Sequence, residues 1–364
     1  MIPIAFPLIG DEEVNAVVRV LRSGRITRGE ETRLFEEEFA RYIGARYAIA
    51  VCNGTVALEL ALRALGVGAG DEVIVPDLTF IATANAVLNV GAKPVFADVD
   101  EKTYTINPDS VMEVLTGRTK AIIPVHLFGH PADMDAIMEI AEDHKLYVIE
   151  DAAQAHGAEI RGVKVGSIGH AGCFSFYATK NMTMGEGGAV TTSLEWVNEK
   201  LRLLRTHGEA SRYLSVTVGG NYNITEMQAA IGRVQLRKLD EMNKKRIMNA
   251  EYLTSQLKRI SGVTTPTVRQ GFKHVFHLYV IRVEENVRDK LLEHLRERGI
   301  GAAIHYPLPL HEQPLYRALG YPSNINPVAR TLSKQLLSLP VHPALTKEDL
   351  DRIIEAINSF FNEQ

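Results

Sequence analysis

The sequence predicts an α/β fold in which a mostly parallel central sheet is flanked by helices and followed by a smaller C-terminal domain. Two observations predict this class. Over the first half of the chain, short runs rich in Val and Ile alternate with amphipathic helical patterns, as expected for βαβ units. The chain also has 364 residues, enough for one large domain and one smaller domain.

The first half of the chain supplies the alternating pattern. Residues 11–21 and 30–43 have the periodicity of amphipathic helices, and Ser23-Gly24 closes the first of them. Strands are then expected at 47–51, 72–75, 94–99, 121–125 and 146–149, with helices between them at 56–65, 81–88, 110–115 and 134–144. Because helices join these strands, the sheet should be mostly parallel.

The pattern changes near residue 180. Apolar residues from Phe174 onward predict a strand that runs into a polar turn, and one more strand is expected at 189–192. The remaining elements are a long helix at 225–257, a strand at 277–283, a helix at 288–298, a Pro-rich stretch and a terminal helix at 347–361. We place the domain boundary inside the long helix, which gives a large domain of residues 1–245 and a small α+β domain of residues 246–364.

The charge and the cysteine content exclude several classes of protein. The net charge of −4 gives no electrostatic footprint for nucleic acid. The two cysteines, Cys52 and Cys173, cannot form a disulfide framework or a cysteine-based zinc site, and no metal is expected. No apolar run could span a bilayer, and the N-terminus does not resemble a signal peptide. We therefore expect a cytoplasmic globular protein without nucleic-acid or membrane partners.

Asn53-Gly54-Thr55 follows a predicted strand and opens a predicted helix. The first N–H groups of a helix have no intrahelical partner, and the helix dipole favours an anion there. The glycine allows a phosphate to approach the backbone, and the threonine hydroxyl adds a donor. A plain helix cap, with Thr55 as the capping residue, is the alternative for this segment considered alone.

Asp151 follows the apolar strand residues 147–149 and a second acidic residue, Glu150. A carboxylate at such a depth is unfavourable unless it is paired. A protonated pyridine nitrogen would be a suitable partner, because the carboxylate would keep the ring cationic and improve it as an electron sink. The alternatives for an isolated aspartate are a helix cap or a structural salt bridge.

Lys180 ends the segment Phe174-Ser175-Phe176-Tyr177-Ala178-Thr179-Lys180. A lysine after an apolar strand can form a Schiff base if burial keeps part of it neutral. The glycines of 185–188 would let the backbone pack closely around a cofactor. A solvated turn lysine is the alternative, but the apolar approach and the glycine-rich exit favour a reactive one.

Taken together, these motifs resemble the DegT/StrS family of sugar-nucleotide aminotransferases, enzymes of the fold-type I, aspartate aminotransferase-like class that use pyridoxal 5'-phosphate (PLP). The matching residues occur in order over nearly the whole chain. They are Ser23-Gly24, Arg28-Gly29, Asn53-Gly54-Thr55, Pro76 to Ala86, Glu150-Asp151-Ala152-Ala153-Gln154-Ala155-His156-Gly157, Phe174-Ser175-Phe176, Lys180, Gly220-Asn221-Tyr222, Gln228-Ala229-Ala230, Ile304-His305-Tyr306-Pro307 and Leu310-His311. A series of this length and order is highly specific.

The resemblance implies a role for each matching residue at the cofactor. Lys180 would hold PLP as an internal aldimine and then move protons between the substrate carbon and the cofactor. Asp151 would pair with the pyridine nitrogen, and Gln154 would contact the phenolic oxygen. Phe80 would stack on one face of the ring. The residues implied for the phosphate are Gly54, Thr55 and Ser175.

The resemblance also implies a homodimer with shared active sites, because Asn221 would reach the phosphate from a second subunit. His305 and Tyr306 would lie near the nucleotide sugar. One departure from the family pattern concerns Gly219-Gly220-Asn221-Tyr222-Asn223, where Asn223 stands in the place of a usual arginine. This departure leaves Asn221 intact but puts any role of that arginine in doubt.

The function implied by the resemblance is amino transfer in amino-sugar and polysaccharide biosynthesis. L-glutamate or glutamine would convert PLP to pyridoxamine phosphate, and a keto-sugar nucleotide would then accept the amine. Two alternatives were weighed. A nucleotide-dependent oxidoreductase is rejected, because the glycines of 66–70 have the wrong spacing and precede a strand. A non-catalytic or regulatory PLP-fold binding protein is disfavoured by Lys180, since a pure binder needs no Schiff-base lysine.

Overall fold

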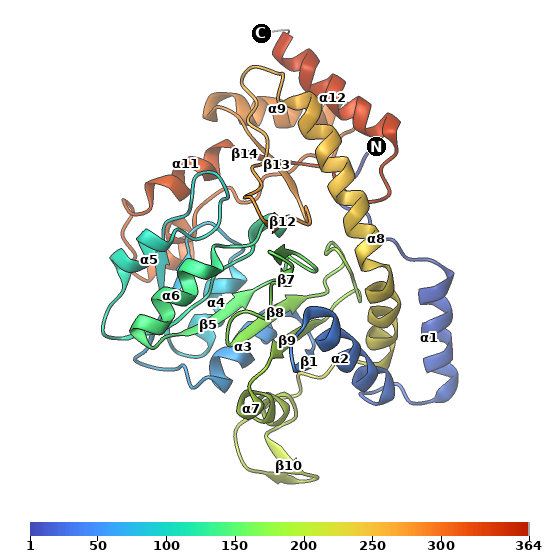
Figure 1. Cartoon of the computed structure of the whole chain (residues 1–364), viewed down its shortest axis with the longest axis vertical. Coiled ribbons are helices and arrows are strands. Elements are labelled where there is room, and N and C mark those ends of the chain that lie inside the picture. The colour runs from blue at the N-terminus through green and yellow to red at the C-terminus, as the bar shows by residue number, and fades with distance from the viewer. Residues whose placement is uncertain (363–364) are drawn as a thin grey trace.

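The computed structural model describes residues 1–362, and over this range it contains a seven-stranded sheet with strand order β1-β9-β8-β5-β4-β2-β3. Its strands are β1 (Tyr47–Val51), β2 (Glu72–Pro76), β3 (Lys93–Ala97), β4 (Thr119–Ile122), β5 (Tyr147–Asp151), β8 (Ala171–Ser175) and β9 (Gly188–Thr192). The strands from β3 to β8 pair in parallel, and only β9 runs antiparallel to both of its neighbours in this sheet. The prediction of a mostly parallel α/β sheet is confirmed (Figure 1).

Helices surround this sheet. Those of the first 257 residues are α1 (Asp11–Ser23), α2 (Glu30–Ile43), α3 (Gly54–Ala64), α4 (Ala82–Asn89), α5 (Pro108–Val114), α6 (Met134–His144), α7 (Glu195–Arg205) and α8 (Glu226–Leu257). The predicted helices agree with these within a few residues. The sequence analysis did not predict α7, the short strands β6 (Glu159–Ile160) and β7 (Val163–Lys164), or the hairpin of β10 (Glu209–Ser211) and β11 (Leu214–Ser215).

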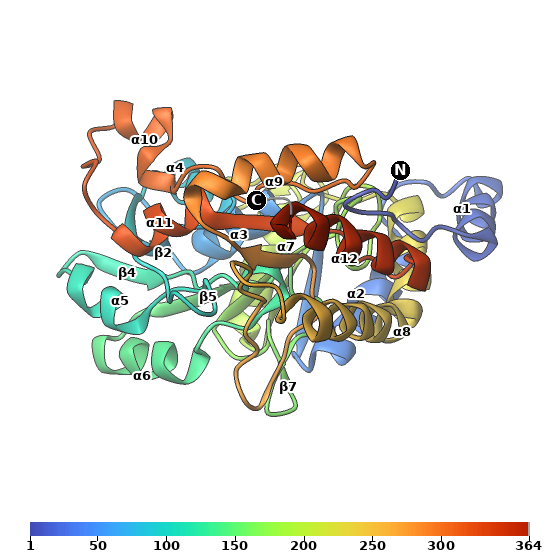
Figure 2. The ribbon, with the colours of Figure 1, turned by 90° about the horizontal axis from the view of Figure 1, so that it is seen from above.

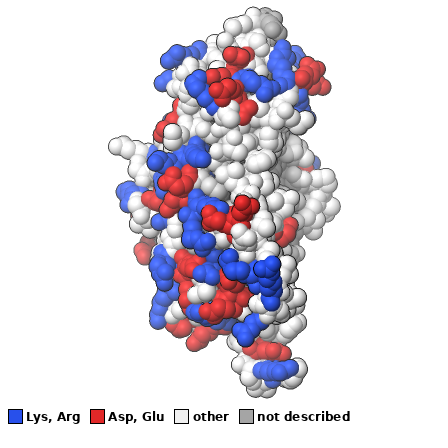
Figure 3. All heavy atoms as spheres, turned by 90° about the vertical axis from the view of Figure 1, so that its right-hand side faces the viewer, with Lys and Arg blue, Asp and Glu red and all other residues white. Residues whose placement is uncertain are grey.

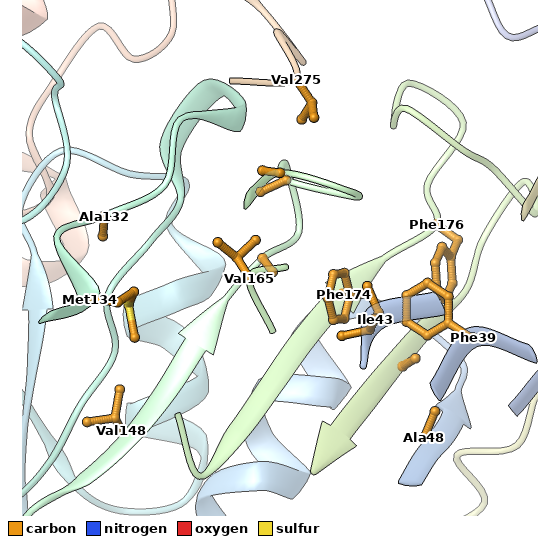
Figure 4. Packing of buried hydrophobic residues seen from close by; sticks show 14 of the residues in the cluster. Phe39, Ile43, Ala48, Ala132, Met134, Val148, Val165, Phe174, Phe176 and Val275 are labelled. Atoms are coloured by element: carbon orange, nitrogen blue, oxygen red, sulfur yellow. The ribbon is translucent and has the colours of Figure 1, made fainter. Parts of the chain in front are cut away.

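Both faces of the sheet are buried. Val148 and Ile149 are neighbours on β5, yet they belong to two different hydrophobic clusters, because successive strand side chains point to opposite faces. On one face, Phe39 of α2 packs edge-on against Phe174 at 5.0 Å and Phe176 at 5.3 Å between ring centroids (Figure 4). This packing fixes the end of β8, from which the chain turns toward Lys180.

The elements of the C-terminal part are β12 (Phe272–Lys273), β13 (Tyr279–Arg282), α9 (Glu285–Glu297), α10 (Pro314–Ala318), α11 (Pro327–Gln335), β14 (Leu336–Leu339) and α12 (Lys347–Asn362). A third hydrophobic cluster lies mainly in this part, among β13, α9, β14 and α12. Figure 2 shows α9 and α12 together on the side of the molecule that carries the C-terminus. Residues Leu253 and Leu257 of α8 join this cluster, whereas Leu239 of the same helix joins the sheet core. The division at residue 245, inside α8, stays a prediction.

The surface shows no strong segregation of charge on the face drawn in Figure 3, where basic and acidic side chains are interspersed. In residues 1–362, no helix combines the length and the apolar character needed to cross a membrane.

Candidate active site

A cavity of about 560 Å³ opens beside the ends of β5 and β8 and the start of α3. The predicted site residues that line it are Gly54, Thr55, Phe80, Asp151, Gln154, Ser175, Lys180, His305 and Tyr306. These residues come from segments far apart in the sequence. They meet here because loops that follow parallel strands gather at the carboxyl edge of the sheet.

The start of α3 forms one wall of the cavity. Asn53 caps this helix, since its Oδ1 accepts a hydrogen bond from the N–H of Val56 at 2.9 Å. The alternative in which Thr55 caps the helix is therefore wrong. The start of α3 lies very close to β8, because a Cβ built on Gly54 would lie only 2.8 Å from the Cβ of Ser175. Gly54 thus lets the first helical N–H groups and the Ser175 hydroxyl converge, which suits an anion.

Asp151, the last residue of β5, is 6% exposed. Its Oδ2 accepts a hydrogen bond from Thr83 Oγ1 at 2.8 Å, and its Oδ1 accepts one from the N–H of Ala153 at 3.2 Å. Burial raises the pKa of Asp151, while these two donors act in the opposite direction. A cationic partner in the cavity would relieve the cost of burying the ionised carboxylate.

Lys180 lies in a turn after β8, where its N–H donates to the carbonyl of Tyr177 at 2.9 Å. Its side chain is partly buried and lines the cavity. Burial lowers the pKa of Lys180 to about 8, and the charge of Asp151 opposes this shift. A substantial fraction of the amine is therefore neutral near physiological pH, as a nucleophile requires.

Gln154 connects the large part of the molecule to the C-terminal part. Its Oε1 accepts a hydrogen bond from the N–H of Phe128 at 2.7 Å, and its Nε2 donates to the Tyr306 hydroxyl at 3.1 Å. These two contacts fix the orientation of the amide. The ring centroids of Tyr306 and Phe80 are 6.0 Å apart. Phe80 lines the cavity and is 53% exposed.

His305 lies beside Tyr306, and its Nδ1 is 2.9 Å from the hydroxyl of Ser338. Burial lowers the pKa of His305 to about 4, and the positive charge of Lys180 adds to the shift. His305 is therefore neutral at physiological pH and can exchange hydrogen bonds with a substrate hydroxyl without adding charge.

Sequence reasoning missed several residues of the site. Ile4, Ala5, Tyr177, Glu186 and His277 line the cavity, and Thr83 lies behind Asp151. Thr83 stands in a motif that matched the family, and its spacing of four from Thr79 was the available signal. His277 and the N-terminal segment gave no signal, because only tertiary structure brings them to the cavity.

Asn221 does not line the cavity within one chain. It is exposed, and it forms a bridge with Thr206 at the base of the β10–β11 hairpin. Asn223 donates from Nδ2 to the Oδ1 of Asn221 at 3.0 Å. Asn223 therefore orients Asn221 in this chain.

The residues of the cavity fit the cofactor implied by the family resemblance. The cradle of Gly54 and Ser175 excludes even a Cβ and presents N–H and hydroxyl donors suited to a phosphate. The buried carboxylate of Asp151 suits a cationic ring nitrogen, and the partly neutral amine of Lys180 suits a Schiff base.

Comparison with known proteins agrees with this reading. Residues 7–358 match the DegT/DnrJ/EryC1/StrS aminotransferase family. The chain is 44% identical to the dTDP-3-amino-3,4,6-trideoxy-alpha-D-glucose transaminase of Streptomyces venezuelae, over 95% of this chain and 91% of that protein. It is 42% identical to the UDP-N-acetyl-3-dehydro-alpha-D-glucosamine 3-aminotransferase of Acidithiobacillus ferrooxidans, over 97% and 94%. The crystal structure of S. venezuelae DesV with a ketimine intermediate superposes with a TM-score of 0.93 at 43% identity, over 96% of this chain and 94% of DesV.

Proposed function

This chain belongs to the DegT/DnrJ/EryC1/StrS aminotransferase family, and from that premise we propose that it moves an amino group from L-glutamate or glutamine to a keto-sugar nucleotide, with PLP as cofactor. It is a PLP-dependent sugar aminotransferase of the fold shared by its structural relatives. The observation that carries the assignment is the single cavity shared by Lys180, Asp151 and the Gly54–Ser175 cradle. PLP sites combine a lysine that forms the Schiff base with a charged partner for the pyridine nitrogen, and a helix N-terminus suits the phosphate.

The family resemblance gives each cavity residue a task, and its place in the cavity is compatible with that task. When bound, PLP would supply the electron sink for breaking a bond at the amino-bearing carbon. The Nζ of Lys180 would anchor the cofactor and, once released, carry the proton to and from that carbon. Asp151 would keep the ring nitrogen protonated. Gln154 would contact the phenolic oxygen, and Phe80 would cover the ring and exclude water.

The anion end of the cavity anchors the cofactor without taking part in proton transfer. The hydroxyls of Thr55 and Ser175 and the N–H groups at the start of α3 would hold the phosphate. This anchor does not depend on the amine of Lys180. It would therefore keep the cofactor in place between the two half-reactions.

The names of the relatives support amination at the third ring position of the sugar. The transaminases from S. venezuelae and A. ferrooxidans both carry a 3-amino or 3-keto sugar in their names. We therefore propose a 3-keto-sugar nucleotide as the amine acceptor. His305 and Tyr306, which line the same cavity as Lys180, would contact the sugar.

We also propose that the working unit is a cytoplasmic homodimer. The hairpin of β10 and β11 projects from the rest of the chain (Figure 1), and the apolar side chains of Tyr213 and Leu214, and of Val218 just after it, are exposed. A second copy would cover this surface. Asn221, at the base of the hairpin, would then reach the phosphate site of the partner. Within residues 1–362 both Cys52 and Cys173 are free thiols, which suits a reducing compartment.

The absorption spectrum of the purified protein with PLP tests this proposal. The wild-type protein should develop a visible band that L-glutamate or glutamine bleaches to the spectrum of pyridoxamine phosphate. The Lys180→Ala variant should not develop the band. A 3-keto-sugar nucleotide should restore the band and yield a 3-amino sugar by mass spectrometry and NMR, whereas a 4-keto isomer should react far more slowly.

The same experiment separates the enzyme from a regulatory binding protein. A protein that binds PLP but responds to no amino donor would be a binding module, and the aminotransferase assignment would fail. Preference for the 4-keto isomer would overturn only the position of amination.

A further inference from the structure

A chain of two threonine hydroxyls leads to the carboxylate of Asp151. Thr79 Oγ1 and Thr83 Oγ1 are 3.2 Å apart, and Thr83 Oγ1 is 2.8 Å from Asp151 Oδ2. Thr79 lies before α4, and Thr83 lies in its first turn. Helical threonines often bond to a backbone carbonyl one turn earlier, but here Thr83 bonds to side chains on both sides.

The direction of these hydrogen bonds follows from the number of protons. An ionised carboxylate can only accept, so the single hydroxyl proton of Thr83 goes to Asp151. Thr83 can then serve only as an acceptor toward Thr79, and the proton between the two hydroxyls comes from Thr79. Both hydroxyls thus act as donors toward the carboxylate end, and neighbouring hydrogen bonds of this kind strengthen each other.

The burial of the chain makes these bonds important. Thr79 is 3% exposed and borders the cavity, whereas Thr83 is 1% exposed and does not, so water does not replace the hydroxyl of Thr83 at low cost. The torsion that rotates the plane of an aspartate carboxylate is soft and has broad minima. Donors on both oxygens, from Thr83 on Oδ2 and from the N–H of Ala153 on Oδ1, are what fix that plane.

We infer that Thr83, supported by Thr79, is a positioning residue that holds the Asp151 carboxylate in the orientation needed to meet the cationic ring nitrogen of the cofactor. This inference rests on the proposed function and deepens it. Thr83 acts through Asp151 and does not itself line the cavity. Its loss should therefore weaken the hold on the ring nitrogen and leave the phosphate anchor intact.

The test is the dissociation constant for pyridoxamine phosphate, which is held without the covalent bond to Lys180. Thr83→Val keeps the shape and removes the hydroxyl, and we expect this constant to rise roughly 10- to 100-fold, the range for losing a hydrogen bond to a charged group. Thr83→Ser restores the hydroxyl and should stay within about threefold of the wild-type value. The PLP absorption band of Thr83→Val should also shift relative to wild type, because the ring nitrogen is held less firmly as a cation.

A matched control is available elsewhere in the chain. Thr116 Oγ1 donates to the Glu72 carboxylate at 2.6 Å, away from the cavity. Thr116→Val removes the same kind of bond and should leave pyridoxamine phosphate binding unchanged. The wild-type half-reaction with L-glutamate, measured in parallel, reports on the proposed function separately from the role of Thr83.

The inference is overturned if Thr83→Val binds pyridoxamine phosphate as wild type does, or if Thr83→Ser is impaired as strongly as Thr83→Val. If Thr83→Val fails to fold, Thr79→Val and Thr79→Ser take its place. The valine variant should then weaken binding by a few-fold and the serine variant should not. Equal dissociation constants of Thr79→Val and Thr79→Ser for pyridoxamine phosphate would also overturn the inference.

Discussion

Burial controls which side chains near Lys180 carry charge. It lowers the pKa of His305 to about 4 and the pKa of His156 to about 3, and in both cases the charge of Lys180 adds to the effect. Burial also lowers the pKa of His277 well below its ordinary value. These histidines are neutral at physiological pH, so Lys180 titrates beside neutral imidazoles and the carboxylate of Asp151.

The lowered pKa of Lys180 predicts how fast the apoprotein attaches PLP at different pH values. Only the neutral amine attacks the aldehyde, so the rate should rise about tenfold for each pH unit below the pKa. Because burial lowers this pKa from 10.5 to about 8, the rise should level off near pH 8. Stopped-flow absorbance at the visible band of the attached cofactor measures this rate.

Two comparisons make the pH profile decisive. Lys180→Ala should give no visible band at any pH, which assigns the signal to this amine. Free PLP mixed with a simple alkylamine provides the profile of a solvated amine and corrects for the ionisation of PLP itself. A corrected rate that continues to rise toward pH 10 would mean that Lys180 titrates as a solvated lysine.

At the scale of elements, the cofactor site depends on how closely the start of α3 approaches β8. A Cβ on Gly54 would lie 2.8 Å from Ser175 Cβ and 3.3 Å from Ser175 Cα. Gly54→Ala must therefore separate the helix from the strand by several tenths of an ångström, and the donors at the two elements would no longer converge on one phosphate. We expect the dissociation constant for PLP to rise by roughly tenfold or more.

The control for this variant is Gly117→Ala, since a Cβ at Gly117 would meet no atom within 4 Å. Both variants should keep the far-ultraviolet circular dichroism of the wild-type protein. Inorganic phosphate should protect wild type against thermal unfolding more than it protects Gly54→Ala. Equal affinity of Gly54→Ala and wild type for PLP would contradict a requirement for this close approach.

The elements that the sequence predicts best are those with a strong local pattern. The expected bounds of α2, β1 and α6 match the observed ones, because each has a clear apolar period and a definite end. The strand expected from Phe174 onward in fact ends at Ser175. The two-residue strands β6, β7 and β12 exist only through their pairing with one another, so no local pattern predicts them. By contrast, α7 has a strong amphipathic pattern that is visible in the sequence.

The residues of the site likewise divide into those that the sequence could indicate and those that it could not. The residues whose chemistry is unusual in its local context, such as Asp151 after an apolar strand and Lys180 before a glycine-rich segment, could be selected from the sequence. Phe80 and Asn221 were selected only through the family resemblance. His277 required the structure, because only its tertiary contacts bring it to the site. For Thr83 the sequence offered the spacing of four from Thr79, but its contact with Asp151 is seen only in the structure.

At the scale of the whole molecule, the position of Asn221 outside the cavity of its own chain points to a second copy. Asn221 lies at the base of a hairpin whose Tyr213 is 82% exposed and whose neighbour Val218 is 81% exposed. Apolar side chains in such a projection are typical of a surface that another copy covers. In a twofold dimer, each hairpin would carry its Asn221 to the cavity of the other chain.

Mixing two impaired variants tests this arrangement. Lys180→Ala lacks the anchoring amine, and Asn221→Ala should bind PLP roughly 10- to 100-fold more weakly, as expected for losing a hydrogen bond to a phosphate. In a mixed dimer, one cavity combines both defects, and the other has Lys180 from one chain and Asn221 from its partner. An equal mixture, after subunit exchange, should therefore recover about one quarter of wild-type activity at limiting PLP, since half of the dimers each have one intact site. If Asn221 instead served the cavity of its own chain, no mixed dimer would contain an intact site, and the mixture would be no more active than its Asn221→Ala component.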